Sequence, residues 1–302
     1  MKLFGLHKSL TRQLREFIPV AALLCLAAGC ATPIGVSYVD RRVAYESLTT
    51  NVLSTERMSS FSARELVNFN LYQEFEDNPQ KALADLHSAL APTGDEERLF
   101  ALAELSFLHA ENSGERSYYL ASAVYAYAFL YPGKQGTPPR GIDPRLRWAV
   151  DLYNQSLTQA AKSDEAAYAI PMGGKFKLPF GELTVSFNER DLIWGDFRMK
   201  DFVPAADIEV RGLRNRYRTP GIGAALAASL EPLEASPQSM RIPPRLKIPV
   251  TAFLRLENPR AALASGKLKG NLEFYTQDSA RTLKIEGVEV PIEYETTSAL
   301  AL

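Results

Sequence analysis

Cys30 is the residue whose type and position most clearly indicate chemistry, because its thiol ends a recognisable N-terminal segment. That segment closes on Leu26-Ala27-Ala28-Gly29-Cys30, after an apolar run from Phe17 to Ala28 that Pro19 interrupts. Basic residues precede the run: Lys2, Lys8, Arg12 and Arg15. A basic start, a short apolar stretch and small residues at its end are the parts of an export signal. The sequence therefore predicts that residues 1–29 direct export.

The end of this signal resembles the lipobox of bacterial lipoproteins, although Ala27 stands where that family usually has Leu. In the family the cysteine thiol is diacylated and the signal peptide is cut before it. The resemblance implies that residues 1–29 are removed and that Cys30 is the site of lipid attachment, with fatty acyl chains such as palmitate. An uncleaved membrane anchor is the alternative, but the apolar run of about 12 residues is shorter than the roughly 20 that a spanning helix needs. Ordinary secretion is a further alternative.

The residue after Cys30 bears on the location of the protein. It is Ala31, whereas Asp at this place resembles an inner-membrane retention signal in Gram-negative lipoproteins. Several acyl chains hold a protein stably at a membrane, where one is marginal. We therefore expect a lipid-anchored protein of the bacterial cell envelope, at the outer membrane and facing the periplasm.

Composition excludes several classes of protein. The formal net charge is −1, with 46% hydrophobic and 23% charged residues, and this balance does not indicate a nucleic-acid-binding protein. Of the two cysteines, Cys25 would leave with the signal and Cys30 would be acylated. The processed chain would then have no free thiol, which excludes cysteine catalysis and a thiolate metal site. We expect no cofactor and no metal.

Catalytic residues are hard to find in the sequence. His87 and His109 lie in predicted helices, and we interpret both as packing or surface histidines, since a triad needs a base held by an orienting carboxylate. The chain has no Gly-x-Ser-x-Gly, His-Glu-x-x-His or Gly-x-x-x-x-Gly-Lys motif. An enzyme within these residues is therefore the least favoured of the functional hypotheses.

One cluster could bind an anion or a partner. It consists of Arg211, Arg214, Arg216, Tyr217 and Arg218, followed by the turn Pro220-Gly221-Ile222-Gly223. Arginine forks bind phosphate or carboxylate in pairs. The loop could contact phospholipid headgroups, another part of the protein or the acidic face of a partner. The alternative is a solvated, salt-bridged loop, which is what most surface charge runs are.

The elements that would carry these residues divide the chain into a helical part, residues 30–164, and a β-rich part, residues 165–302. Helix start signals recur in the first part. Ser62-Ala63-Arg64-Glu65 fits a capping box, Asn78-Pro79 fits an N-cap followed by proline, and Asp95 and Asp143-Pro144 fit further starts. Another helix is predicted to begin around Tyr118.

Two predicted helix pairs start near Ala63 and Glu96, a spacing close to the 34 residues of tetratricopeptide repeats. Repeat-like helical hairpins and a plain helical bundle are both compatible with this pattern.

From about Ala169 glycine, proline and β-branched residues become more frequent, which favours strands. The predicted strands are 182–187, 207–210, 247–256, 268–274, 283–285 and 288–294, with a turn at Gly287. The expected fold class is α+β, with helical hairpins followed by a β-rich domain, perhaps a sandwich. The chain ends on the apolar residues Ala299 to Leu302, which suggests that the domain is truncated.

Four segments together resemble the N-terminal part of bacterial lipoproteins that carry an α/β-hydrolase domain further along the chain. They are Cys30–Val36, Thr50–Ser54, Arg214–Gly223 and Val290–Tyr294. The resemblance implies that the serine nucleophile lies beyond Leu302, so no catalytic residue is assigned here. We expect a module that positions a linked hydrolase at the membrane. The alternative is a stand-alone lipoprotein scaffold that binds partners through helical repeats.

Overall fold

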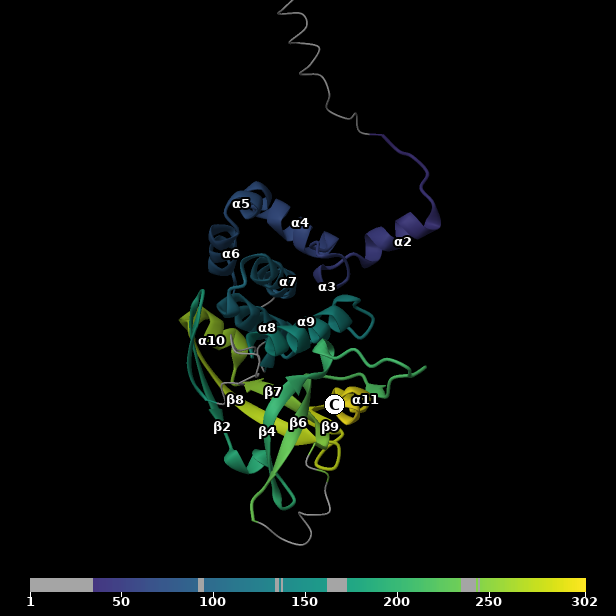
Figure 1. Cartoon of the computed structure of the whole chain (residues 1–302). Helices are drawn as coiled ribbons and strands as arrows, with labels where there is room; N and C mark the ends of the chain where they lie inside the picture. Colours follow the sequence, from purple (N-terminus) through teal and green to yellow (C-terminus); the bar gives the residue numbers. More distant parts are fainter. Residues whose placement is uncertain are drawn as a thin grey trace, which may run out of the picture. The chain divides into compact units, whose positions relative to one another are not determined.

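The chain divides into two units, Met1–Tyr45 and Glu46–Leu302 (Figure 1). The computed structural model describes residues 35–91, 95–133, 136, 138–161, 173–234, 243 and 245–302. Cys30 and the predicted signal peptide lie outside the described residues. In the first unit, residues 35–45 are exposed except for the half-buried Ala44. Helix α2 (Arg41–Thr49) begins in this unit and contains no buried residue.

Seven helices precede the first strand of the second unit. They are α3 (Val52–Thr55), α4 (Ser60–Asn68), α5 (Tyr72–Asp77), α6 (Pro79–Ser88), α7 (Glu96–Ser113), α8 (Arg116–Leu130) and α9 (Arg145–Ala160). Helices α7 and α8 contact each other along their length, and α8 packs in the same way on α9. Among the described residues, no helix combines the length and apolar character needed to cross a membrane.

The helix starts match the sequence in part. Asn78 caps α6 as predicted, because its side chain accepts a hydrogen bond from the Lys81 amide at 3.3 Å. The predicted capping box at Ser62 is wrong. Ser59 is the N-cap of α4, and the Ser62 hydroxyl instead donates to the carboxylate of Glu104 on α7. Glu104 accepts from the hydroxyls of both serines, so one buried carboxylate holds the N-cap and the first turn of α4 together.

The other predicted starts are close to those observed. Helix α9 begins at Arg145, whose amide donates to Asp143 at 2.9 Å, and α8 begins two residues before Tyr118. Asp95 precedes α7 but makes no side-chain capping bond to it. Its carboxylate accepts instead from the Ala91 amide and the Arg98 guanidinium.

A seven-stranded mixed sheet follows, in the order β1-β2-β8-β7-β6-β4-β3. Its strands are β1 (Gly174–Leu178), β2 (Gly181–Phe187), β3 (Ile193–Trp194), β4 (Phe197–Pro204), β6 (Ala224–Pro232), β7 (Lys247–Leu256) and β8 (Lys267–Thr276). Strands β2 and β8 are parallel, and the other neighbours are antiparallel. The α+β class is confirmed. The sandwich and the repeat-like hairpins are not confirmed, since these strands form one sheet against which α8 and α9 pack.

Smaller elements complete the unit. Strands β9 (Thr282–Ile285) and β10 (Val288–Pro291) form a hairpin that turns at Gly287, as predicted. Strands β5 (Arg218–Thr219) and β11 (Tyr294–Glu295) pair with each other. Helices α10 (Pro259–Ser265) and α11 (Thr296–Ala301) follow β7 and β11 respectively.

Strand prediction succeeded where β-branched and aromatic residues alternate and failed elsewhere. Strand β7 has the predicted bounds, and β8 and β9 contain the predicted segments. The predicted strand at 207–210 is wrong, because Asp207 ends a short 3-10 helix and residues 208–210 are not in a strand. Strand β6 was missed because it is alanine-rich. Strand β4 was missed because an irregularity between Lys200 and Val203 breaks its alternation.

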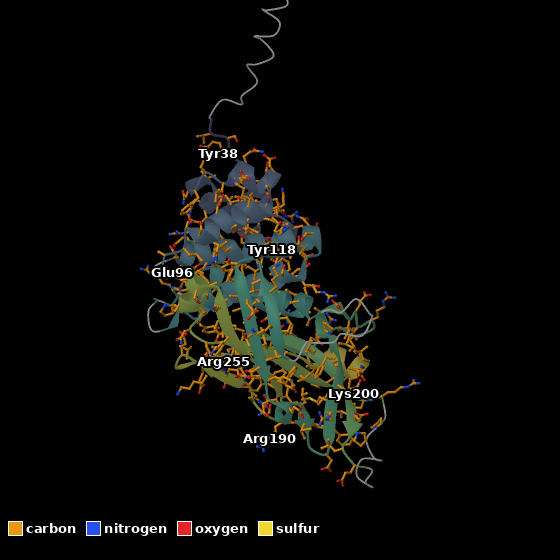
Figure 2. All side chains as sticks on the ribbon, turned by 90° about the vertical axis from the view of Figure 1, so that its left-hand side faces the viewer. Tyr38, Glu96, Tyr118, Arg190, Lys200 and Arg255 are labelled. Atoms are coloured by element: carbon orange, nitrogen blue, oxygen red, sulfur yellow. The ribbon has the colours of Figure 1, made fainter. Side chains whose placement is uncertain are left out.

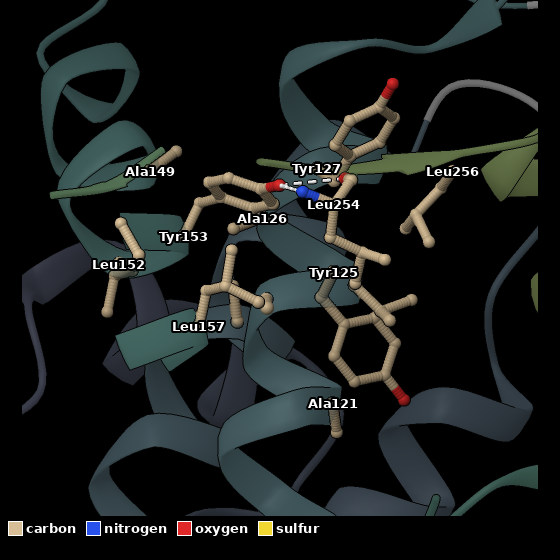
Figure 3. Packing of buried hydrophobic residues seen from close by; sticks show 14 of the residues in the cluster. Ala121, Tyr125, Ala126, Tyr127, Ala149, Leu152, Tyr153, Leu157, Leu254 and Leu256 are labelled. Carbon is tan, nitrogen blue, oxygen red and sulfur yellow. Dashed lines mark hydrogen bonds between the residues drawn. The ribbon is translucent and has the colours of Figure 1, made fainter. Parts of the chain in front are cut away.

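The core of this unit joins helices to sheet. Tyr153 of α9 lies with its ring centroid 5.8 Å from that of Phe253 on β7. Its hydroxyl donates to the Leu254 carbonyl and accepts from the Leu254 amide, both at 2.8 Å (Figure 3). Arg255 of β7, which Figure 2 labels, pairs with Glu273 of β8 at 2.8 Å. One side chain of α9 thus fixes the helix to the backbone of a central strand.

Candidate functional site: a polar groove along α9

A polar groove runs along α9 in the second unit. It consists of a hollow of about 590 Å³ and an adjoining one of about 100 Å³, and Asp151, Gln155 and Arg218 line both. The larger hollow is also lined by α3 and α7, and the smaller by the loop after β5 and the segment before α11. We call these two hollows together the α9 groove.

The spacing of residues on α9 explains which side chains face the groove. Arg147, Asp151, Gln155 and Gln159 follow one another at intervals of four, so they share one face of the helix. Arg147 pairs with Asp151 through two hydrogen bonds of 2.9 and 2.6 Å. Tyr153 and its neighbours Leu152 and Leu157 are buried. The helix is therefore amphipathic, with amide and charged groups on its groove side.

Two segments far apart in sequence form one wall of the groove. Strand β5 pairs with β11, so that Arg218 lies opposite Glu295 and Thr219 opposite Tyr294. Ile222 forms a bridge with Ile292, in which the Ile222 amide donates to the Pro291 carbonyl at 2.9 Å. The segments Arg218–Gly223 and Pro291–Glu295 thus behave as a single ribbon.

Asn154 fastens this ribbon to α9. Its amide nitrogen donates to the Gly221 carbonyl at 3.0 Å, and its amide oxygen accepts from the Gly223 amide at 2.6 Å. Gly221 is required at this place, because a Cβ atom there would overlap the backbone of Pro291 and Ile292. The glycines of the predicted turn therefore serve close packing of backbone on backbone.

Two buried carboxylates anchor the arginines of the wall. Glu293 accepts from Nε of Arg218 at 2.5 Å and from the Gly221 amide at 3.0 Å, and Nη2 of the same guanidinium also lies 2.5 Å from the carboxylate. Glu295 lies 3.9 Å from Nε of Arg216, and its other oxygen caps α11 by accepting from the Ser298 amide at 2.5 Å. Burial raises the pKa of Glu293, although the bonds from Gly221 and Arg218 oppose this shift.

The predicted arginine cluster is brought only partly to the groove. Arg216 and Arg218 line it, while Arg211 pairs with Glu209 at the surface at 2.9 Å. Arg214 and the side chain of Tyr217 are exposed. The backbone amide of Tyr217 donates to the Thr297 hydroxyl at 2.6 Å, which adds α11 to the same assembly.

Sequence reasoning missed Glu293, Glu295 and Asn154. The two glutamates fall in the run Glu293-Tyr294-Glu295, where an alternating strand pattern places acidic and aromatic residues on opposite faces. Asn154 interrupts the apolar stripe of its helix between Tyr153 and Leu157. A polar residue at a buried helix position is the one local signal that could have indicated a bond to another segment.

Three of the four segments that suggested a family resemblance contribute residues to this groove. Val52 and Leu53 line the larger hollow, and Arg216, Gly223 and Glu293 line the smaller one. Asn51 caps α3 and holds the first of these segments in place, since its side chain accepts from the Leu53 amide at 3.0 Å. Residues from three separate parts of the chain therefore converge on one surface feature.

The two histidines lie elsewhere and pack against aromatic rings. Nδ1 of His87 is 2.8 Å from the Tyr125 hydroxyl, and its ring stacks on Phe180 at 4.7 Å between centroids. His109 meets the ring of Tyr118 edge-on at 4.4 Å. Burial lowers the pKa of both imidazoles, so both are mainly neutral near pH 7.

A cavity of about 330 Å³ lies beside His87. It is lined mainly by aliphatic residues together with Asp95 and Arg260. Two nitrogens of Arg260 donate within the protein: Nε to the Ala128 carbonyl at 3.1 Å and Nη1 to Glu96 at 3.2 Å. Its buried Nη2 has no hydrogen-bond partner among the described residues.

Helix α7 carries a further buried acid, Glu104, which is 0% exposed. One of its oxygens accepts from the Ser59 amide, the Ser59 hydroxyl and the Ser62 hydroxyl at 3.0, 2.6 and 2.5 Å. The other accepts from the Val52 amide at 3.1 Å. Because Val52 begins α3, this carboxylate fixes the wall of the α9 groove formed by α3.

The side chains of the groove can hydrogen-bond to a ligand or partner and pair with its charged groups. Its polar lining consists of carboxylates, guanidiniums, carboxamides and one threonine hydroxyl, and that hydroxyl, on Thr158, already donates to a backbone carbonyl. Among the described residues no group of three potential ligands is placed to hold a metal ion. No protein-family model, curated protein or solved structure matches the chain.

Proposed function

We propose that this chain is a lipid-anchored module of the bacterial cell envelope, tethered through Cys30, that holds an α/β-hydrolase domain by its α9 groove. That domain would belong to the same polypeptide, beyond Leu302. The observation that carries the proposal is the convergence of Thr50–Ser54, Arg214–Gly223 and Val290–Tyr294 on the groove. The same segments carry the resemblance to lipoproteins with a hydrolase domain. Their convergence supports the groove as the surface through which such a module would act.

The groove is suited to hold a folded partner domain in a fixed orientation. Two pairs of its charged groups are already formed within the protein, Arg147 with Asp151 and Arg218 with Glu293. The side chains of such pairs are already held in place, so a partner that contacts them loses little conformational entropy on binding. The same network holds residues 293–298 to the rest of the second unit. A domain attached after α11 would therefore be joined to a segment that is fixed in place.

The alternative function is a stand-alone scaffold or assembly factor, and one observation favours it. Helices α7 and α8 are joined by only Gly114 and Glu115 and pack along their length, as in a helical hairpin. Hairpins of this kind bind partners in helical-repeat proteins. In this version the partner is a separate protein.

The first test is the intact mass of the native protein, extracted from the membranes of its source. A mass well above 33.4 kDa that includes acyl groups is expected, together with hydrolysis of a short-chain p-nitrophenyl ester. A mass equal to residues 30–302 plus acyl groups would leave only the scaffold. Cys30→Ser is expected to abolish incorporation of a labelled palmitate and to release the protein from membranes; retention would contradict the anchor.

A second test examines the groove. Gln155→Arg places a bulky charge on the groove face of α9, and Lys177→Glu is a matched control on the exposed face of β1. In the native polypeptide, Gln155→Arg is expected to expose the linker after α11 to limited proteolysis, while Lys177→Glu leaves the pattern unchanged. Equal patterns in both variants would argue against the groove as the contact surface.

A further inference from the structure

The smaller hollow of the α9 groove is lined by a buried carboxylate with one unpaired oxygen. The carboxylate belongs to Glu295, whose side chain is 7% exposed. Its Oε2 atom caps α11 by accepting from the Ser298 amide, whereas Oε1 accepts no hydrogen bond from the described residues. A buried carboxylate oxygen normally has a donor, since leaving it unpaired is unfavourable. A ligand that enters the hollow can supply this donor.

Arg216 does not supply it. Its Nε atom lies 3.9 Å from Oε1 of Glu295, which is longer than a hydrogen bond. Two other contacts hold this guanidinium where it is, because its Nη2 atom donates to the Ile208 carbonyl at 2.5 Å and to the Ser298 hydroxyl at 3.2 Å. The protein therefore keeps a positive charge near Glu295 without closing the Oε1 position.

The charge of the groove favours a cationic ligand. Five acidic and three basic side chains line its two hollows, so the formal net charge of the lining is −2. These side chains are Glu56, Glu111, Asp151, Glu293 and Glu295, and Arg147, Arg216 and Arg218. In the smaller hollow, Asp151 and Glu293 already pair with arginines at 2.6 and 2.5 Å. Glu295 is thus the carboxylate of this hollow that is left without a hydrogen-bonded cation among the described residues.

The size of the smaller hollow restricts what can enter it. Its volume is about 100 Å³, below the roughly 300 Å³ at which typical small-molecule sites begin. A single side chain fits this space better than a free organic ligand. Of the cationic side chains, arginine suits a buried carboxylate best, because a guanidinium is more weakly hydrated than an ammonium group and donates through several nitrogens.

We propose that an arginine side chain of the partner domain enters the smaller hollow and donates to Oε1 of Glu295. The inference rests on the proposed function, in which the α9 groove is the contact surface, and it specifies the chemistry by which the groove recognises its partner. Because Oε2 of the same carboxylate caps α11, this contact would join the partner directly to α11.

The test places a photo-crosslinking residue at the smaller hollow of the native protein, in the membranes of its source. Ala206 is exposed and lines this hollow, and p-benzoylphenylalanine replaces it. After illumination, mass spectrometry is expected to find a crosslinked partner peptide that contains an arginine. Glu295→Gln is expected to lower the yield at least about tenfold, since its carboxamide can still cap α11 but has no charge. Glu209→Gln, outside the groove, is the matched control and should leave the yield unchanged.

Each outcome decides the matter. A crosslinked hydrolase peptide without an arginine, or a yield that Glu295→Gln leaves unchanged, would overturn the inference while the groove remains the contact surface. An arginine peptide from a separate protein, with a yield that depends on Glu295, would support the inference and contradict the linked domain. No crosslink from position 206, nor from the same residue at position 155, would overturn both. The identity of the crosslinked peptide does not depend on how well Glu295→Gln folds.

Discussion

Arg218 and Glu293 are 75 residues apart in sequence and form an ion pair at 2.5 Å that joins the two segments of the groove wall. The carboxylate is buried, whereas the side chain of the arginine is 48% exposed. The Gly221 amide donates to the Glu293 carboxylate and the Thr251 hydroxyl donates to the Glu293 backbone carbonyl, so this pair is the centre of a larger network.

Arg218→Gln is expected to lower the free energy of unfolding by about 2 kcal/mol. Breaking a fully buried ion pair costs about 3–5 kcal/mol, and the exposure of Arg218 reduces that figure. Chemical denaturation measures the change. Arg211→Gln is the control, because its pair with Glu209 is exposed on both sides and should contribute less than about 0.5 kcal/mol. Similar losses in the two variants would mean that the pair with Glu293 contributes no more to the free energy of unfolding than an exposed ion pair.

Gly221→Ala is expected to destabilise the protein by at least about 3 kcal/mol, because the new Cβ would overlap the backbone of Pro291 and Ile292. Gly114→Ala is the control. Gly114 also needs a glycine conformation, at φ 73°, but nothing lies near its Cβ position, so about 1 kcal/mol is expected. Thermal denaturation compares the two variants. If Gly221→Ala were as stable as Gly114→Ala, the two segments of the ribbon could move apart at little cost in stability.

Tyr153→Phe is expected to cost about 1–3 kcal/mol, because it leaves the buried amide and carbonyl of Leu254 without their partner. Tyr118→Phe is a suitable control: this tyrosine is buried, and its hydroxyl makes no hydrogen bond to the described residues. A loss of less than about 0.5 kcal/mol is expected there. Equal losses would indicate that the packing of the ring, rather than the hydroxyl, holds α9 to β7.

Glu104→Ala is expected to lower the free energy of unfolding by about 3–5 kcal/mol at pH 7, since four donors from α3, α4 and the residues between them lose their acceptor. Asp85→Ala on α6 is the exposed control and should change stability by less than about 0.5 kcal/mol. Protease sensitivity of the segment 50–62 should rise in Glu104→Ala alone. If the segment stays protected, other contacts hold it.

Stability should also depend on pH through Glu104. Burial raises its pKa above the ordinary value of 4.5. A carboxyl whose pKa is raised in the folded state stabilises most below its unfolded pKa, and this contribution is lost as pH rises through the folded pKa. The advantage of the native protein over Glu104→Gln should therefore be larger at pH 4 than at pH 7, as measured by urea denaturation. A larger advantage at pH 7 would mean that the four donors lower the pKa.

The sequence by itself determined the features that depend on neighbours along the chain. The α+β class, the cap at Asn78, the turn at Gly287 and the bounds of β7 follow from local propensity and periodicity. Local patterns failed at β6, where alanines carry no strand signal, and at Ser62. Tertiary contacts outweigh propensity at such places.

Only the tertiary structure decided which polar groups meet. The bonds of Ser62 to Glu104, Arg218 to Glu293 and Tyr153 to Leu254 join residues 42, 75 and 101 positions apart. Such pairs leave no periodic trace in the sequence, because each partner alone looks like an isolated polar residue. Burial is what makes them specific: a buried donor or acceptor must find its partner, and the fold alone sets which partner is within reach.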